Sequence, residues 1–221
     1  DSFEAVQRVR IDASSCVKDL EKKSDMIRAQ LDGMLRNPQV IKREYLSDGT
    51  VQARLAFSLT GGLAQLALPQ SIKPVPQIKT CSPSTDESKR AGGAAAAPSR
   101  ASVFTGLILD ARGLDGLPAL VPVVVTESGN EIYGPAVVSR EYAVQQGMAV
   151  FVVDLETAKR SARVTNHPMI VRGLRTLKGS GCTFVISDAD GAMVRGASES
   201  LLFLKQCKVI IVLDPIRSAP D

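Results

Sequence analysis

A stretch without hydrophobic periodicity divides this 221-residue chain into two parts. Between residues 74 and 102, four prolines punctuate Ser/Thr-rich and charged sequence, and Gly92-Gly93 precedes four alanines. This composition is typical of a linker or an exposed excursion, and a structureless loop of this length is uncommon inside one compact domain. We therefore expect a first part over residues 1–73, a linker over 74–102, a second part over 103–214 and a tail over 215–221.

The first part is predicted to hold a long helix followed by a hairpin. Apolar residues recur every three or four positions, a spacing typical of one helical face, and Asn37-Pro38 ends the pattern: Val6, Val9, Ala13, Cys16, Leu20, Ile27, Leu31 and Met34. Asp48-Gly49 then separates residues 39–46 from an alternating run over 51–59, which is a strong hairpin signal. We expect the helix to pack on one face of the hairpin, with an intermolecular coiled coil as the alternative for that helix.

The second part is predicted to be rich in strands. Apolar runs bounded by turn residues indicate strands over residues 105–109, 120–126, 131–133, 149–153, 169–174, 183–186 and 208–213. Helices are expected over 155–163, with Asp154 as its cap, and over 189–204, capped by Ser187 or Asp188. Strands and helices do not alternate strictly, so we expect a mixed α+β part with a strand-rich sheet and two or three helices.

The most conspicuous polar cluster is Asp110, Arg112 and Gly113, directly after an apolar run. Asp110 could serve as a general acid or a metal ligand, but the sequence offers no recognisable base, nucleophile or metal partner. The favoured interpretation is structural: Asp110 pairs with Arg112 or accepts hydrogen bonds from the turn. We expect no enzymatic activity and no cofactor or metal.

The four cysteines show no metal-ligand spacing, and the chain has one histidine, which argues against a zinc site. Cys182 and Cys207 each begin a strand-like apolar run, so they form the first candidate pair for a disulfide. Two buried free thiols are the alternative.

The distribution of charge and the scarcity of aromatic residues argue against two classes of binding function. The net charge is +4 and its Lys and Arg residues are dispersed, whereas a nucleic-acid site needs a clustered basic patch. We therefore expect no nucleic-acid partner. The nine aromatic residues, none of them Trp, also argue against a base- or sugar-stacking surface.

Several segments resemble FlgP-type flagellar outer-membrane lipoproteins. The resemblance rests on the Thr105–Leu114 sequence TGLILDARGL, on Gly129–Gly134 (GNEIYG), on the Asp48-Gly49-Thr50-Val51 hairpin and on the ending Cys207–Val212 (CKVIIV). It implies a periplasmic protein at the outer membrane that forms a ring or disk around the flagellar rod and contacts other ring or rod proteins. The start of the chain shows no cysteine to carry the family's lipid anchor, and the 74–102 segment is longer than the resemblance predicts.

These observations together lead to two functional hypotheses. The first is a structural, self-assembling protein of the cell envelope, in the flagellar motor. The second is a periplasmic adaptor that recruits another envelope protein without self-assembly and uses the linker for recruitment.

Overall fold

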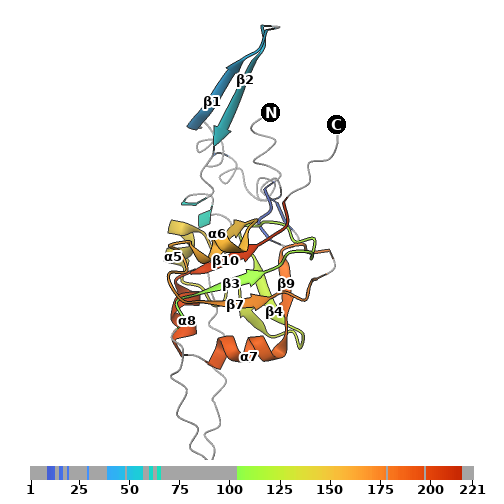
Figure 1. Cartoon of the computed structure of the whole chain (residues 1–221), viewed down its shortest axis with the longest axis vertical. Coiled ribbons are helices and arrows are strands. Elements are labelled where there is room, and N and C mark those ends of the chain that lie inside the picture. Colours follow the sequence, from blue (N-terminus) through green and yellow to red (C-terminus); the bar gives the residue numbers. More distant parts are fainter. Residues whose placement is uncertain are drawn as a thin grey trace, which may run out of the picture.

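The computed structural model describes residues 9–12, 15–16, 19, 29, 39–47, 49–56, 60–61, 64–65, 104–177, 179–196 and 198–215. The main regular elements of these residues are three sheets and four short helices, and strand outnumbers helix, 32% to 22%. The body holds two four-stranded sheets, and a two-stranded hairpin projects away from it (Figure 1). The linker predicted over residues 74–102 lies outside the described residues.

The first sheet is entirely parallel, in the order β6-β10-β3-β7. Its strands are β3 (Gly106–Asp110), β6 (Val150–Val152), β7 (Pro168–Arg172) and β10 (Val209–Val212). β3 and β10 occupy the centre and are apolar on both faces, as strands of a sheet covered on both sides must be. Because β3 and β10 are covered on both faces, their sequences are continuously apolar.

The second sheet has the order β5-β4-β9-β8. Its central strands β4 (Val123–Thr126) and β9 (Thr183–Ile186) are parallel, while β5 (Glu131–Tyr133) and β8 (Arg175–Thr176) pair antiparallel at the edges. The main core joins the two sheets, because alternate residues of β3 and β10 pack with buried residues of β4 and β9, among them Leu107, Ile211, Val124 and Phe184.

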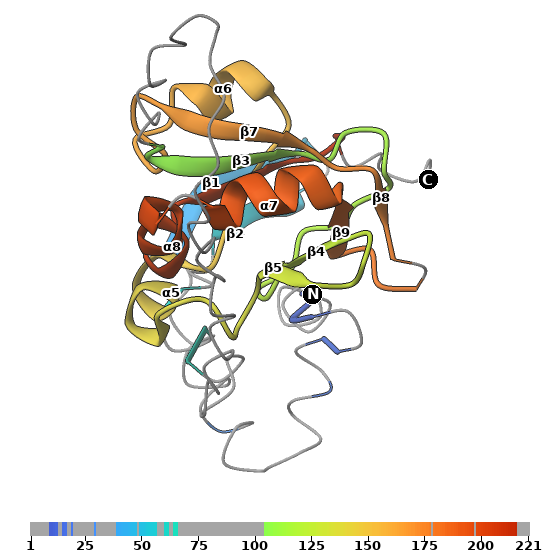
Figure 2. The ribbon, with the colours of Figure 1, turned by 90° about the horizontal axis from the view of Figure 1, so that it is seen from below.

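The helices cover both faces of the first sheet. α6 (Leu155–Lys159) lies on one face, where Ala158 packs with Ile108 and Ile210. α7 (Asp188–Gly196) and α8 (Ser198–Lys205) lie on the opposite side (Figure 2). α5 (Arg140–Gln146) adds Ala143 to the main core. Among the described residues, no helix has the length and apolar character needed to cross a membrane.

The predicted caps explain where two helices begin. The Asp154 carboxylate accepts a hydrogen bond from the Thr157 N–H (2.8 Å), which satisfies a free amide of the first turn of α6. The Ser187 hydroxyl likewise accepts from the Asp190 N–H (3.0 Å) at the start of α7. The single helix predicted over residues 189–204 is instead two elements, α7 and α8.

The predicted long N-terminal helix is wrong at its beginning. Arg10 and Cys16 form an antiparallel bridge, and the Asp12 carboxylate accepts a hydrogen bond from the Ser15 N–H (2.9 Å). This local bond favours a turn over a helix. The same segment is hydrogen-bonded to the edge of the body. The N–H groups of Leu120 and Val121 donate to the carbonyls of Arg10 and Ile11. Most of the remaining predicted helix lies outside the described residues.

The predicted α+β class, with a long helix packed on the hairpin and a mixed second part, is therefore corrected. The molecule is a sheet-rich fold with short helices, and no long N-terminal helix is present in its described residues. The hairpin itself forms, as β1 (Gln39–Tyr45) and β2 (Val51–Ala56). Every residue of β1 is exposed, and no helix of the described residues packs on it.

Candidate interaction surfaces

The cluster of Asp110, Arg112 and Gly113 lies at the carboxyl end of β3. Arg112 donates two hydrogen bonds to the two oxygens of Asp110, from Nε (2.8 Å) and Nη2 (2.7 Å). The Gly113 N–H donates to Oδ2 of Asp214 (2.5 Å), just beyond the end of β10, and Gly113 has a φ of 78°, which suits glycine. The cluster thus connects the carboxyl ends of β3 and β10, which are neighbouring parallel strands.

Asp110 and Arg112, the charged residues of this cluster, pair with each other. The hydrogen bonds from the Arg112 side chain hold the pKa of Asp110 below its ordinary value, although partial burial acts in the opposite direction. In the part of the chain that the structure describes, no group of three or more His, Cys, Asp or Glu residues could hold a metal ion. Both carboxylate oxygens of Asp110 are thus engaged by Arg112, which favours the structural interpretation.

Cys182 and Cys207 are both free, buried thiols, so the structure contains no disulfide between them. Cys182 precedes β9 of the second sheet and Cys207 precedes β10 of the first. Burial raises the pKa of each thiol, which lowers its reactivity as a nucleophile.

The hairpin of β1 and β2 presents one mainly apolar face, which also carries Arg43. Tyr45 lies opposite Val51, and Arg43 lies opposite Ala53. A bulge between Val40 and Lys42 shifts the register, so that Val40 pairs with Leu55. Because residues directly opposite each other in a sheet share a face, the bulge brings Val40 to the face of Tyr45 and Val51. Lys42, Glu44 and Gln52 occupy the other face.

This apolar face is open to solvent. Tyr45 is 77% exposed, Val51 55% and Val40 45%. A two-stranded hairpin is at best marginally stable by itself in water, and large exposed apolar faces usually mark a protein–protein contact. At the turn, Gly49 has a φ of 86° and its N–H donates to the Leu46 carbonyl. The Asp48 of the predicted turn lies outside the described residues.

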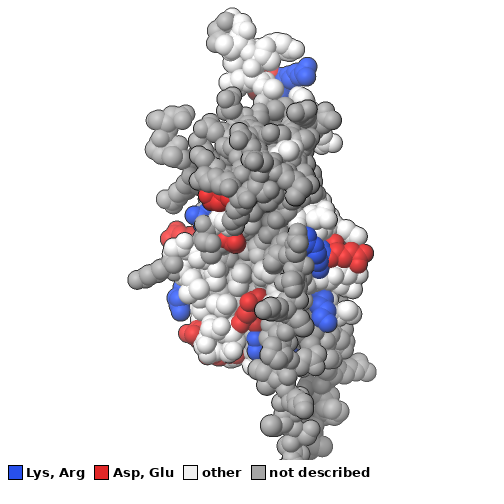
Figure 3. Space-filling model, turned by 180° about the vertical axis from the view of Figure 1, so that it is seen from behind, with Lys and Arg blue, Asp and Glu red and all other residues white. Residues whose placement is uncertain are grey.

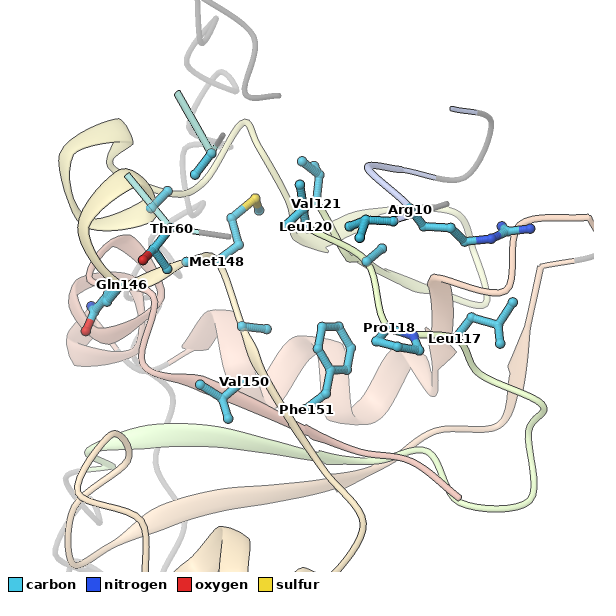
Figure 4. A pocket seen from close by; sticks show the side chains of 16 residues that line it. Arg10, Thr60, Leu117, Pro118, Leu120, Val121, Gln146, Met148, Val150 and Phe151 are labelled. Carbon is cyan, nitrogen blue, oxygen red and sulfur yellow. The ribbon is translucent and has the colours of Figure 1, made fainter. Parts of the chain in front are cut away.

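An apolar trough of about 560 Å³ is the second open feature. Four segments line it. They are residues 9–10, then Thr60 with Ala64, then residues 117–121, and lastly residues between 143 and 151 from the end of α5 and from β6. Thr60 and Gln146 lie at one end, Met148 and Phe151 further along, and Leu117, Pro118 and Arg10 at the other end (Figure 4).

The described charges do not gather into patches of one sign on the face shown in Figure 3, where acidic and basic side chains are interspersed. The described residues on that face therefore form no patch of one sign that could attract a charged partner.

Residues 106–215 match the family described as Treponema pallidum Tp0624, second domain. The matched range contains both four-stranded sheets, and the hairpin and the N-terminal segment lie outside it. No curated protein matches the chain. The similarity thus places this part of the chain beside the Tp0624 second domain, and it confirms no assignment to FlgP-type proteins.

Sequence reasoning found the hairpin and the Asp110 cluster but missed both apolar surfaces. The alternating apolar residues of β2 predicted an apolar face, but they did not indicate which part of the protein, if any, covers it. The trough is assembled from segments more than a hundred residues apart in sequence, so no local pattern indicates it.

Proposed function

We propose that this chain is a structural, self-assembling subunit of the bacterial cell envelope and that it is not an enzyme. The observation that carries the proposal is the apolar face of the hairpin, defined by Val40, Tyr45 and Val51, which no described residue of the body covers. Covering that face with a different surface of a second copy removes apolar surface from water, which favours association, and heterologous contacts of this kind can close into a ring.

The resemblance to FlgP-type proteins supports a more specific form of the proposal, a ring or disk at the flagellar rod, in the periplasm at the outer membrane. Contacts to other ring or rod proteins belong to this form. The Asp110 cluster supports the proposal that the chain is not an enzyme, because its polar groups pair with one another at the carboxyl ends of two strands.

The first test compares two neighbouring substitutions in β2. Val51→Asp places a charge on the apolar face, whereas Gln52→Asp places the same charge on the opposite face of the same strand. We expect the Val51 variant to lower the mass of the assembled particle, measured by light scattering across concentrations, and the Gln52 variant to assemble like the unchanged protein. A wild-type protein that stays monomeric at high concentration contradicts self-assembly.

The second test addresses the envelope role. Particles released from bacterial envelopes by mild detergent are weighed and imaged. A large closed particle that contains rod or ring proteins supports the flagellar form, whereas a monomer held by one envelope protein supports the adaptor instead. In that case, deleting residues 75–102 abolishes retention by the partner but leaves the fold intact.

A further inference from the structure

The apolar trough is elongated and has few polar groups along its length. Met148, Phe151, Leu120 and Val121 lie along its middle, Gln146 and Thr60 at one end and Arg10 at the other (Figure 4). Its volume of about 560 Å³ falls within the range of small-molecule sites, which is roughly 300–1,000 Å³. The trough therefore has the size of a ligand site, with apolar walls and polar ends.

Several main-chain groups along the trough are already engaged, although β6, which lines it, is an edge strand that pairs only with β10 among the described strands. The carbonyls of Gln146 and Gly147 accept hydrogen bonds from Arg163 (2.9 and 2.6 Å), and the Met148 carbonyl accepts from the Tyr133 hydroxyl (2.5 Å). On the facing wall, the N–H groups of Leu120 and Val121 donate to the N-terminal segment. A ligand that needs hydrogen bonds along its length would leave its own polar groups unpaired here, at a cost. An alkyl chain has no such groups.

Arg10 supplies a charge at one end. Its side chain is half-buried and forms no ion pair with any described residue. A half-buried guanidinium beside an apolar trough favours an anionic group at that end, through charge-assisted hydrogen bonds. The opposite end has the neutral side chains of Thr60 and Gln146, so the two ends differ in charge.

From these observations we propose that the trough binds a single-chain anionic amphiphile, such as a fatty acid. The alkyl chain lies along Phe151 and Met148, and the carboxylate lies at Arg10. This inference is independent of the assembly proposed above, because the trough and the hairpin face share no residue.

The direct test titrates the purified full chain with dodecanoate below its micelle concentration, by calorimetry. We expect saturable binding of one dodecanoate per chain. Ala149→Phe fills the trough, since Ala149 lines it on the same side of β6 as Phe151, and weakens binding more than tenfold. Ala189→Phe adds the same ring at an exposed position of α7 and leaves binding unchanged. Thermal melting of both variants establishes that they are folded.

The charge of the ligand is tested with dodecyltrimethylammonium, which has the same chain and the opposite charge. We expect the unchanged protein to prefer dodecanoate by about fivefold or more, as one partly exposed charge contact provides. Arg10→Gln removes this preference, whereas Arg175→Gln, at an exposed arginine of β8, keeps it. Equal affinities of the unchanged protein for the two amphiphiles would overturn the carboxylate end of the proposal.

Methionine methyl NMR gives a readout that needs no substitution. Dodecanoate is expected to shift the Met148 signal, while the signal of Met193, exposed on α7, stays in place. Absence of saturable binding, or equal binding to the Ala149→Phe protein, refutes the site. A synthetic peptide of residues 39–56 that shifts Met148 where dodecanoate does not also refutes it, and identifies the trough as a protein contact.

Discussion

At the scale of single residues, Arg163 connects the ends of two helices of the body and forms no ion pair with a described carboxylate. Its guanidinium donates to the carbonyls of Cys207 (2.8 Å), Gln146 (2.9 Å) and Gly147 (2.6 Å), which lie at the ends of α8 and α5. The C-terminal ends of helices carry partial negative charge, so these carbonyls replace a carboxylate. Burial lowers the pKa of Arg163, but an arginine remains charged at any ordinary pH.

Arg163→Met is therefore expected to destabilise the fold by about 1–3 kcal/mol, because it removes charge-assisted hydrogen bonds to part-buried carbonyls at the ends of two helices. Urea unfolding followed by circular dichroism measures the loss. Arg175→Met, at an exposed arginine of β8, is the control and should change stability by less than about 0.5 kcal/mol. Equal stability of the two variants would show that water satisfies the carbonyls.

The Asp110–Arg112 pair predicts a pH dependence. Since the pKa of Asp110 is lowered in the fold, the pair stabilises the protein above the pKa of the unfolded carboxyl, and this contribution is lost as the pH falls through the folded pKa. Asp110→Asn should thus cost a little stability at pH 7, and this cost should shrink as the pH falls through the folded pKa of Asp110. The effect should be small because Arg112 is partly exposed.

Unfolding curves at several pH values test this prediction. In an Arg112→Gln background, the Asp110→Asn substitution should lose most of its effect at pH 7. A full effect in that background would assign the stability to other contacts of Asp110.

At the scale of elements, α7 lies very close to the second sheet at Gly191. A methyl group at Gly191 would come within 2.3 Å of Cγ2 of Thr126 and 3.3 Å of Cδ1 of Ile132. We expect Gly191→Ala to destabilise the fold by about 1–3 kcal/mol through this overlap. Gly196→Ala, at the end of the same helix, meets nothing within 4 Å and should be neutral or stabilise by up to about 1 kcal/mol. Thermal melting distinguishes the two.

The elements of the second part could be predicted largely from local sequence, and their arrangement could not. The seven predicted strand regions each overlap one strand of the second part, since apolar runs such as 208–213 are bounded by turns and charges, whereas the two-residue strand β8 (Arg175–Thr176) was missed. The parallel first sheet was missed, although β3 and β10 lack the alternation of half-exposed strands. Pairing between β3 and β10 joins residues about a hundred positions apart, which no local pattern encodes.

The N-terminal segment shows why a helical spacing can mislead. Val9, Ala13 and Cys16 have helical spacing, but Ile11 falls off that stripe and is the residue that the core buries, at 2% exposure. The sequence Asp12-Ala13-Ser14-Ser15 contained a competing signal, because Asp and Ser bond locally to the backbone. Similarly, the candidate disulfide rested on two equivalent strand starts, which the fold places on different sheets.

At the scale of the whole molecule, the body extends beyond the range that matches the Tp0624 second domain. Ile11 lies about a hundred residues before Val121, yet its carbonyl accepts the Val121 N–H (2.7 Å) and its side chain joins the main core. We therefore expect a fragment of residues 104–215 to be markedly less stable than the full chain. In the full chain, Ile11→Ala should cost about 2–4 kcal/mol, as for other large core residues, whereas Ile41→Ala, 64% exposed on β1, should be nearly neutral. Urea unfolding measures all three proteins. If the fragment and the Ile11 variant both unfold like the full chain, the N-terminal segment only rests on a body that is complete without it, and the matched domain folds by itself.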